Sequence, residues 1–383
     1  MIYFDNSSTS YPKAPGVSQA VAEILERGSF NINRGGYAGA YEMSSLVLDA
    51  REKVAELFDS PTGREVVFTS SVTQSLNVAL KGLLRPGDHV VTTQMEHNGV
   101  IRPLAQLQEL GVHVDVAHCR QDGMLDLADM ESKIIERTKL VVMTHASNVC
   151  GAILPIREVG LICRRQGALL LVDCAQTAGI LPISMLRDKI DILAFTAHKG
   201  LLSAQGLGGL VLSQQIANEM TPLIAGGTGS HSHVADMPKE LPDRLEAGTL
   251  NLPGIVALSV ALDYIKEVSI DAIYKHEMNL LSRLSRGLDN IPGVCIVGPE
   301  NMADKCAVAA LDFPTMDNAE VAARLDEEYG IMTRCGLHCA PVAHKAMGTF
   351  PRGVVRCSFG HKNTEAEVDV LLHALRNITE GYA

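Results

Sequence analysis

An acid and a lysine at the ends of two apolar strands constrain the fold of this chain more than any other feature. Residues 168–172 form a short apolar run that predicts a buried parallel strand, and the run ends at Asp173. A second apolar run, 191–195, leads into Lys199. Because the strands of an open α/β sheet deliver their carboxyl ends to one ligand crevice, we expect Asp173 and Lys199 to share one edge of a sheet.

The rest of the chain favours the same α/β class. Apolar strands at 89–93, 112–116 and 140–144 alternate with helical patterns, which is the rhythm of a mainly parallel sheet. From Pro253 a long helix leads into a different pattern. That pattern predicts a smaller α+β unit with strands at 294–297, 306–311 and 354–357 and helices at 319–328 and 364–376.

The composition excludes several functional classes. The chain has 383 residues, 46% of them hydrophobic, and no apolar run approaching the roughly 18 residues of a transmembrane helix. Its formal net charge is −11 without a basic block, so we expect neither nucleic acid nor a membrane as a partner. The N-terminus lacks the segments of a signal peptide, and the nine cysteines show no framework spacing, so we expect a cytoplasmic protein with reduced thiols.

An acid paired with a lysine in such a crevice points to pyridoxal 5'-phosphate (PLP). A lysine amine can condense with the aldehyde of this cofactor, and an acid can keep its pyridinium nitrogen protonated. Taken alone, Asp173 is more simply a helix cap and Lys199 a solvated loop lysine. The neighbouring His198 and the hydroxyl of Thr196 favour the cofactor, because both side chains suit its phosphate.

The motifs around these residues, VDCAQTAG and FTAHKGLLSAQGLGG, resemble the class V aminotransferase family of fold-type I PLP enzymes, and within it the cysteine desulfurases and selenocysteine lyases. The resemblance implies an α/β fold with a large, mainly parallel sheet domain at 14–255 and a smaller α+β domain at 256–383. It also implies that the N-terminal segment, 1–13, joins the smaller domain. A homodimer with active sites shared between its subunits is expected for the same reason.

Further motifs of the family assign cofactor contacts. The resemblance implies that His97, in an E-H motif, stacks on the PLP ring and carries protons. It implies that Asn148, in H-x-S-N-x-x-G, and Gln176 contact the phenolic oxygen of the ring. Ser71 and Val72 stand where the G-T-T-E phosphate loop of the family has glycine and threonine. The phosphate ligands implied by the resemblance are Val72, Thr73, Thr196, His198 and, from the neighbouring subunit, Thr249.

A second motif lies far along the chain, at 334–341. Its sequence, RCGLHCAP, resembles the R-x-G-x-H-C-A segment of the desulfurase branch, so the resemblance places the catalytic cysteine at Cys339. A thiol attacks as the thiolate, and Arg334 and His338 are close enough in sequence to favour that form. Two alternatives to a catalytic Cys339 stay open. The cysteines here could be inert core residues, or a zinc site could be formed by Cys335, His338, Cys339 and His344.

The substrate contacts are also implied by the resemblance. Arg356 matches the arginine that binds the substrate carboxylate, where a bidentate guanidinium fixes the orientation of an amino acid. Asn148, Arg334 and Asn6 are further candidates for substrate contacts, and Arg34 is a candidate at the substrate entrance.

Together these assignments predict a cysteine desulfurase. Lys199 removes the Cα proton of L-cysteine, and the Cys339 thiolate attacks the substrate sulfur, which leaves a persulfide on Cys339 and releases L-alanine. The persulfide then passes to an acceptor protein, and no metal is expected. A selenocysteine lyase would use the same residues, whereas an epimerase or transaminase of the family would not need Cys339. A non-catalytic scaffold with this fold would have no need of Lys199.

Overall fold

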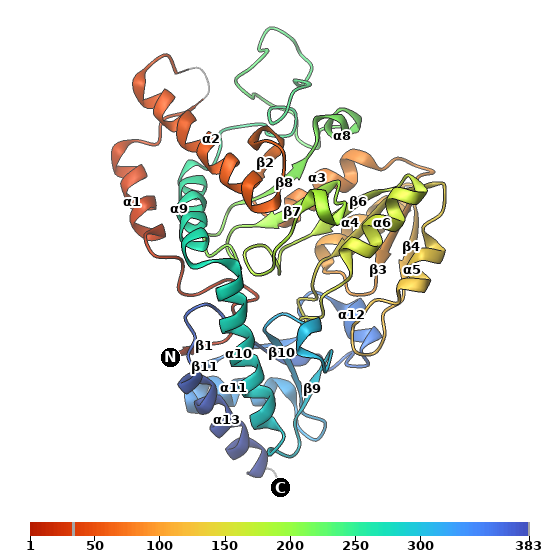
Figure 1. The fold of residues 1–383 in the computed structure, drawn as a ribbon, viewed down its shortest axis with the longest axis vertical. Coiled ribbons are helices and arrows are strands. Elements are labelled where there is room, and N and C mark those ends of the chain that lie inside the picture. The colour runs from red at the N-terminus through yellow and green to blue at the C-terminus, as the bar shows by residue number, and fades with distance from the viewer. Residues whose placement is uncertain (33–34, 382–383) are drawn as a thin grey trace.

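The computed structural model describes residues 1–32 and 35–381 and shows two lobes stacked along the long axis of the molecule (Figure 1). The upper lobe is built on a seven-stranded sheet in the order β2-β8-β7-β6-β5-β3-β4. Its strands run parallel except for β8, which is antiparallel to both of its neighbours. The strands are β2 (Val66–Thr69), β3 (His89–Thr93), β4 (His113–Ala117), β5 (Thr138–Thr144), β6 (Leu169–Asp173), β7 (Ile192–Thr196) and β8 (Gly208–Leu212).

Helices cover both faces of this sheet, because its central strands are apolar on both sides. Along β5, Leu140 and Val142 belong to one core, and Val141 and Met143 belong to the other. The first core also contains residues of α3 (Val72–Leu83), α4 (Asn98–Glu109) and α8 (Gln214–Glu219). The second contains residues of α1 (Val17–Arg27), α2 (Ala38–Phe58), α5 (Leu127–Lys133), α6 (Ile156–Gln166), α7 (Met185–Asp188) and α9 (Leu252–Val268).

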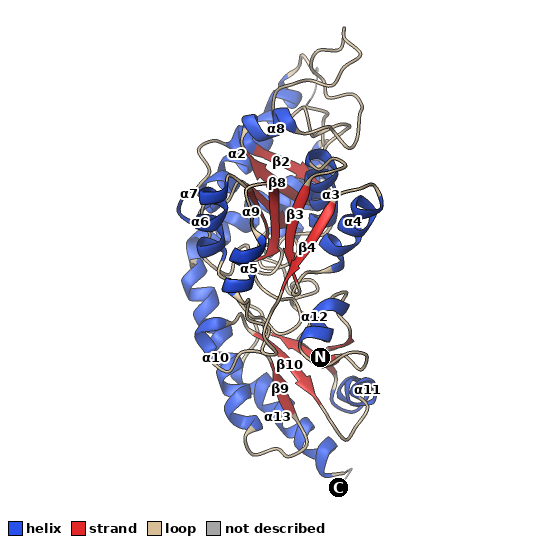
Figure 2. Cartoon of the chain, turned by 90° about the vertical axis from the view of Figure 1, so that its right-hand side faces the viewer, coloured by secondary structure: helices blue, strands red, loops and turns tan. Residues whose placement is uncertain are grey.

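The lower lobe contains an antiparallel four-stranded sheet in the order β12-β13-β10-β9 (Figure 2). A third hydrophobic core joins this sheet to its helices. The N-terminal strand belongs to this lobe, because β1 pairs in parallel with β11. The elements are β1 (Ile2–Tyr3), α10 (Ile270–Leu288), β9 (Cys295–Val297), β10 (Val308–Asp312), α11 (Asn318–Tyr329), β11 (Ile331–Met332), β12 (Arg334–Gly336), α12 (Pro341–Ala346), β13 (Val354–Ser358) and α13 (Glu365–Glu380).

Two successive helices connect the lobes. Residues of α9 pack into the core of the upper lobe, and residues of α10 pack into the core of the lower lobe. Ser269 lies between the two helices and has a positive φ of 73°. The predicted division between residues 255 and 256 falls within α9, and the domain boundary itself stays a prediction.

The helix ends show where apolar patterning is insufficient. The pattern predicts a helix over 44–58, whereas α2 begins at Ala38. Alanines favour a helix but are too small to mark an apolar face, so the first turn of α2 escapes the pattern. Arg34, the predicted residue of the substrate entrance, lies outside the described residues. Within the described ranges, no helix is long and apolar enough to cross a membrane.

A buried ion pair ties α2 to the segment before α9. The Arg51 guanidinium donates to the Glu246 carboxylate through Nη1 at 2.8 Å and Nη2 at 2.6 Å. The same carboxylate accepts the backbone N–H of Phe68 on β2. Both charged side chains are buried, at 7% and 4% exposure. The pair therefore joins three segments that are far apart in the sequence.

Replacing Glu246 with alanine is expected to lower the free energy of unfolding by about 3 kcal/mol, because the buried guanidinium of Arg51 loses its counter-charge. Urea unfolding followed by circular dichroism, at one fixed protein concentration, would measure the loss. Glu267→Ala, at an exposed position of α9, is the matched control. A loss no larger than that of the control would contradict the assignment.

Candidate active site

Predicted site residues from both lobes meet at the junction between the lobes. Asp173 is the last residue of β6, which pairs in parallel with β5 and β7. Lys199 lies three residues after the end of β7, in the turn before β8. From the lower lobe, Arg356 on β13 reaches across and donates through Nη1 to the backbone carbonyl of Asn148 at 2.8 Å. A crevice thus lies between one edge of the large parallel sheet and the smaller sheet of the lower lobe.

The surroundings of Lys199 favour its neutral amine. Burial lowers its pKa to about 8, Asp173 opposes this shift, and the guanidinium groups of Arg356 and Arg334 add to it. Burial also raises the pKa of Asp173, whereas the N–H of Ala175, at 2.9 Å, and the charge of Lys199 favour its carboxylate. A lysine whose pKa lies near neutrality is suited to nucleophilic and general-base chemistry.

His97 is a neutral imidazole with a defined tautomer. Its Nδ1 accepts the backbone N–H of Gly99 at 2.9 Å, so its proton lies on Nε2. Burial, and then the positive charges of Lys199 and Arg102, lower its pKa to about 4. At neutral pH the ring is therefore uncharged and can donate only from Nε2.

Glu96 is a buried acid that the sequence reasoning does not assign to the site. One carboxylate oxygen accepts the Thr93 hydroxyl at 2.6 Å and the Thr144 N–H at 2.9 Å, which ties β3 to β5. The other oxygen is buried without a partner. Burial raises the pKa of Glu96 to about 8, and the charge of Asp173 adds to the shift. The only signal for Glu96 in the sequence is its place directly before His97.

The predicted phosphate ligands lie at a strand end and at a helix N-terminus. Thr196 ends β7, and both its hydroxyl and the Nδ1 atom of His198 are buried without a hydrogen-bond partner. Val72 and Thr73 form the first turn of α3, which Ser71 caps. Unpaired backbone N–H groups and the helix dipole favour an anion at such a turn.

Thr249 lies on the surface of the chain, in the segment before α9. It is exposed and lines a surface hollow of about 200 Å³ together with Thr69, Ser70 and Gln74. Lys199 does not line that hollow. None of the other predicted phosphate ligands lines it either, but Ser70 and Gln74 flank Val72 and Thr73 in the sequence.

Arg356 already pairs with a carboxylate of its own chain. Its Nη2 donates to Asp5 Oδ1 at 2.7 Å and to the Ser8 hydroxyl at 2.6 Å, whereas its Nε is buried without a partner. The exposed Arg334 donates to the same Ser8 hydroxyl at 2.8 Å. The turn after β1 thus brings Asp5 to the predicted substrate arginine. An incoming carboxylate must displace Asp5 or use the free Nε–H.

The amide of Asn6, a predicted substrate contact, is engaged within the protein. Its Nδ2 donates to the carbonyl of Ser358 at 3.0 Å and to Asn363 Oδ1 at 3.1 Å, and its Oδ1 accepts the N–H of Tyr11 at 3.1 Å. These bonds tie the N-terminal segment to β13 and to the turn before α13. Because both hydrogens of the amide are engaged within the protein, the structure does not support a substrate contact for Asn6.

Cys339 is exposed in the turn between β12 and α12. Its neighbour His338 does not supply the positive charge expected from the sequence, because burial lowers the pKa of His338 to about 3 and leaves the ring neutral. The zinc alternative also lacks support. Among the described residues, no group of three or more potential ligands is arranged to hold a metal ion, including Cys335, His338, Cys339 and His344.

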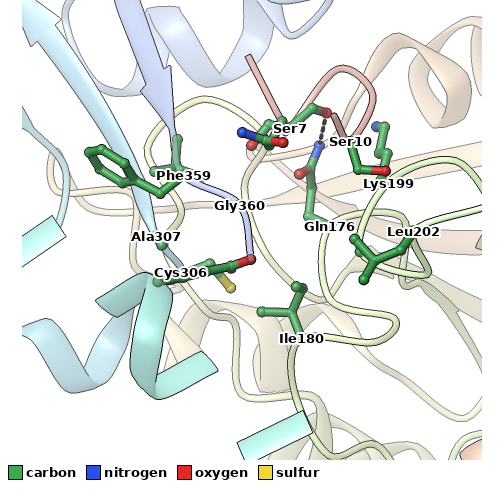
Figure 3. A pocket seen from close by; sticks show the side chains of 14 residues that line it. Ser7, Ser10, Gln176, Ile180, Lys199, Leu202, Cys306, Ala307, Phe359 and Gly360 are labelled. Atoms are coloured by element: carbon green, nitrogen blue, oxygen red, sulfur yellow. Dashed lines mark hydrogen bonds between the residues drawn. The ribbon is translucent and has the colours of Figure 1, made fainter. Parts of the chain in front are cut away.

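A cavity of about 40 Å³ lies between the lobes, lined by Lys199, Gln176 and Glu277 among others (Figure 3). Gln176 donates from Nε2 to the backbone carbonyl of Ser7 at 3.2 Å. Glu277, on α10, is only 4% exposed, and none of the hydrogen bonds or ion pairs of the described residues involves its carboxyl. Since a water molecule needs at least about 10–15 Å³ of such space, the cavity is large enough to hydrate this carboxyl.

Replacing Glu277 with glutamine is expected to stabilise the protein at alkaline pH and to change little under acidic conditions. Burial raises the pKa of Glu277 from 4.5 to about 8, so the folded chain keeps a proton that the unfolded chain releases. That contribution to stability is complete below pH 4.5 and is lost as the pH rises through about 8. Thermal unfolding across this range measures the effect, with Glu267→Gln as the exposed control. An equal shift at both ends of the range would exclude ionisation as the cause.

Several buried polar atoms without partners belong to the predicted site residues. They include Asn148 Oδ1, Thr196 Oγ1, His198 Nδ1 and Arg356 Nε. Buried polar groups are normally paired, because an unpaired group loses its hydration without compensation. Their presence around one crevice indicates a ligand with several hydrogen-bonding groups.

Comparisons with known proteins agree with this geometry. The family model for aminotransferase class-V matches residues 2–371. A probable cysteine desulfurase from Methanothermobacter thermautotrophicus is 34% identical, over 98% of this chain and 94% of its own length. A probable cysteine desulfurase from Pyrococcus abyssi is 33% identical, over 99% of this chain and 94% of its own length.

Solved structures show the same fold. The apo structure of a cysteine desulfurase from Thermococcus onnurineus superposes with a TM-score of 0.92 at 32% identity, covering 99% of this chain and 95% of that one. The cysteine desulfurase CsdA from Escherichia coli superposes with a TM-score of 0.88 at 27% identity, covering 99% and 94%. The predicted α/β fold and the resemblance are thereby confirmed, and the chain belongs to the aminotransferase class-V family.

Proposed function

We propose that this chain is a PLP-dependent cysteine desulfurase, which converts L-cysteine to L-alanine and leaves a persulfide on Cys339. The observation that carries the proposal is the set of groups at one junction of the lobes. Lys199 has a pKa of about 8, Arg356 binds carboxylates, and the thiol of Cys339 is exposed. The names and the near-complete coverage of the relatives support the same activity.

Three of the unpartnered polar atoms of the crevice, on Asn148, Thr196 and His198, belong to residues that would hold PLP. When it is bound, this cofactor supplies an electron sink for the bond that breaks at the substrate Cα. The residues that would hold it are Asp173 at the ring nitrogen, Asn148 and Gln176 at the phenolic oxygen, His97 over the ring, Lys199 at the aldehyde, and Val72, Thr73, Thr196 and His198 at the phosphate.

Different residues of the chain carry out the successive steps of the proposed reaction. Arg356, with Arg334 beside it, binds the substrate carboxylate and orients the amino acid. Lys199 takes the Cα proton as a free amine, and His97 is placed to donate a proton from Nε2. The Cys339 thiolate then attacks the substrate sulfur. An S–S bond forms, and the C–S bond breaks with its electron pair on carbon. A proton taken up at that carbon and the return of a proton to Cα then complete alanine.

We also propose a homodimer in which Thr249 completes the phosphate site of the neighbouring subunit. Thr249 is exposed and lines a surface hollow that Lys199 does not line, which is compatible with a residue that serves a partner. Helices α1 and α2 and the segment 220–250 lie in the upper part of the upper lobe (Figure 1), and they carry large exposed hydrophobic residues, which favour contact with a second copy. These residues are Leu25, Tyr41, Leu48, Leu223, Ile224 and Val234, with Phe30 and Tyr37 near the helix ends.

The position of Cys339 suits onward transfer of its sulfur. Cys339 is one of two exposed cysteines among the described residues. A persulfide there is open to attack by the thiol of an acceptor protein. A cytoplasmic location, where thiols stay reduced, is the compartment that we propose for this chemistry.

The proposal is tested by incubating the PLP-loaded protein with L-cysteine, with and without a thiol reductant. We expect alanine and sulfide in equal amounts with reductant, and without it an added sulfur atom on the peptide that contains Cys339. Failure of the protein to bind PLP would exclude the proposal. Turnover of L-selenocysteine without turnover of L-cysteine would assign a selenocysteine lyase instead.

A further inference from the structure

The segment that carries Cys339 is held in a backbone conformation that side chains rarely adopt. His338 and Cys339 are consecutive residues with φ values of 50° and 55°, both in the left-handed region. Glycine adopts this region freely, whereas other residues meet steric strain there. Two adjacent strained residues persist only when surrounding contacts hold them in place.

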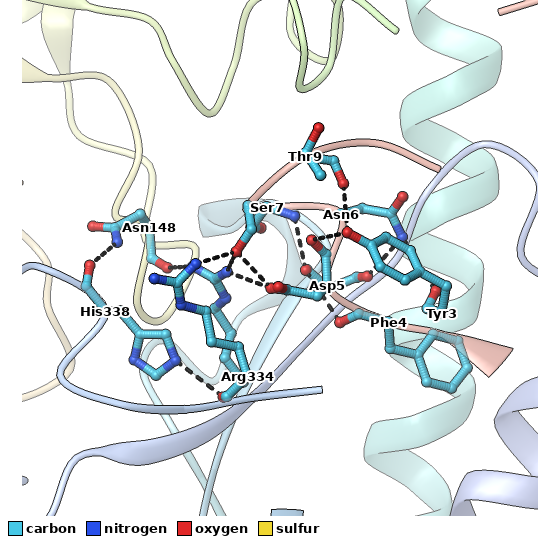
Figure 4. A network of polar contacts seen from close by, with 12 residues as sticks. Tyr3, Phe4, Asp5, Asn6, Ser7, Thr9, Asn148, Arg334 and His338 are labelled. Atoms are coloured by element: carbon cyan, nitrogen blue, oxygen red, sulfur yellow. Dashed lines mark hydrogen bonds and ion pairs between the residues drawn. The ribbon is translucent and has the colours of Figure 1, made fainter. Parts of the chain in front are cut away.

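Two hydrogen bonds from the upper lobe hold these residues. The backbone N–H of Asn98, the first residue of α4, donates to the carbonyl of Cys339 at 2.7 Å. The side chain of Asn148, which follows β5, donates from Nδ2 to the carbonyl of His338 at 2.7 Å (Figure 4). Each strained residue therefore has its carbonyl fixed by a different element of the large sheet lobe.

The contact with His338 also fixes the orientation of the Asn148 amide. A backbone carbonyl only accepts hydrogen bonds, so the amide nitrogen must face His338. The Oδ1 atom then points elsewhere and is buried without a donor. The backbone carbonyl of Asn148 meanwhile accepts Arg356 Nη1 at 2.8 Å. One residue thus contacts both the substrate arginine and the segment that carries the thiol.

We propose that Asn148 is a positioning residue for Cys339, which holds the His338 peptide in its left-handed conformation and so aims the thiol at the substrate sulfur. This role is separate from any contact between Asn148 and the cofactor, and it rests on the proposed desulfurase function only for its catalytic consequence. One hydrogen on Nδ2 serves His338, and the second remains for a ligand. Asn148 thereby links the ligand site to the thiol segment, which lies 190 residues away in sequence.

The first test uses the full chain without cofactor and measures amide hydrogen exchange. In Asn148→Ala, we expect the amides of residues 338–340 to exchange about 5- to 10-fold faster than in the wild type, because one hydrogen bond that restrains them is lost. Peptides from α6 are the internal control and should be unchanged. Unchanged exchange at 338–340 would overturn the proposal, whatever the enzyme proves to catalyse.

The second test uses backbone preference at position 338. His338→Ala and His338→Gly both remove the imidazole, but only glycine adopts the left-handed region without strain. If Asn148 acts by holding that conformation, adding Asn148→Ala should accelerate exchange in the His338→Ala background and have a much smaller effect in the His338→Gly background. Equal effects in the two backgrounds would overturn the proposal.

The third test separates positioning of the thiol from a contact with the cofactor. In the PLP-loaded Asn148→Ala variant, we expect persulfide formation from L-cysteine to fall about 10-fold, while exchange of the Cα hydrogen of L-alanine with deuterated solvent falls much less. That exchange needs Lys199 and the cofactor but not the thiol. An equal loss of both rates would show that Asn148 acts only at the cofactor. If the Cα hydrogen exchanges but neither the wild type nor the variant forms a persulfide, the proposed function is wrong. The amide hydrogen-exchange results do not depend on that outcome.

Discussion

Replacing Cys339 with serine is expected to lower the release of alanine and sulfide from L-cysteine by at least about 1,000-fold. A serine hydroxyl is almost wholly protonated at neutral pH, and it cannot take up a sulfur atom as a persulfide. The exposed position of Cys339 means that the substitution removes no core packing. Parallel assays of alanine and sulfide, at equal PLP content, would measure the loss.

The control for this variant is Cys295→Ser, at the other exposed cysteine of the described chain. Cys295 lies on β9 in the lower lobe, and its replacement should leave the rate unchanged. Cys339→Ser should still bind PLP, because Cys339 is not among the residues that would hold the cofactor. If it keeps the wild-type rate of sulfide release, the persulfide step is wrong even though the PLP site stands.

Replacing Lys199 with alanine is expected to lower turnover by about 10,000-fold, the upper end of what a positioned acid–base group contributes. The crevice then lacks the amine beside Asp173, whose pKa burial lowers to about 8. Both alanine release and exchange of the Cα hydrogen of L-alanine should be lost, because each needs this base. The second measurement does not involve Cys339 and so isolates the role of Lys199.

Two further measurements serve as controls for the Lys199→Ala variant. Lys239→Ala, at an exposed position in the segment after α8, should keep the wild-type rates. Added methylamine should restore part of the Cα exchange in Lys199→Ala, because a free amine can enter the space that the side chain leaves. Cα exchange at the wild-type rate in the unrescued variant would show that Lys199 is not the base.

A structural feature can be predicted from the sequence when neighbouring residues carry its signal. The strands β6 and β7 are buried on both faces, so they appear as uninterrupted apolar runs, and Asp173 and Lys199 follow at their ends. The start of α2 has no such signal, because Ala38 and Ala40 mark no apolar face. The role of Glu96 could not be predicted either, since nothing in a single sequence shows that a glutamate is fully buried.

The sequence by itself determines the α/β class, the family and the residues that its motifs share, because strand periodicity and short motifs are properties of neighbouring residues. Only the tertiary structure decides which distant groups meet. It pairs Asp5 with Arg356, it commits the amide of Asn6 to the protein, and it makes His338 neutral. It also holds Cys339 in a left-handed turn. Contacts and charge states of this kind depend on burial and on distances between chain segments, and these arise only when the two lobes pack together.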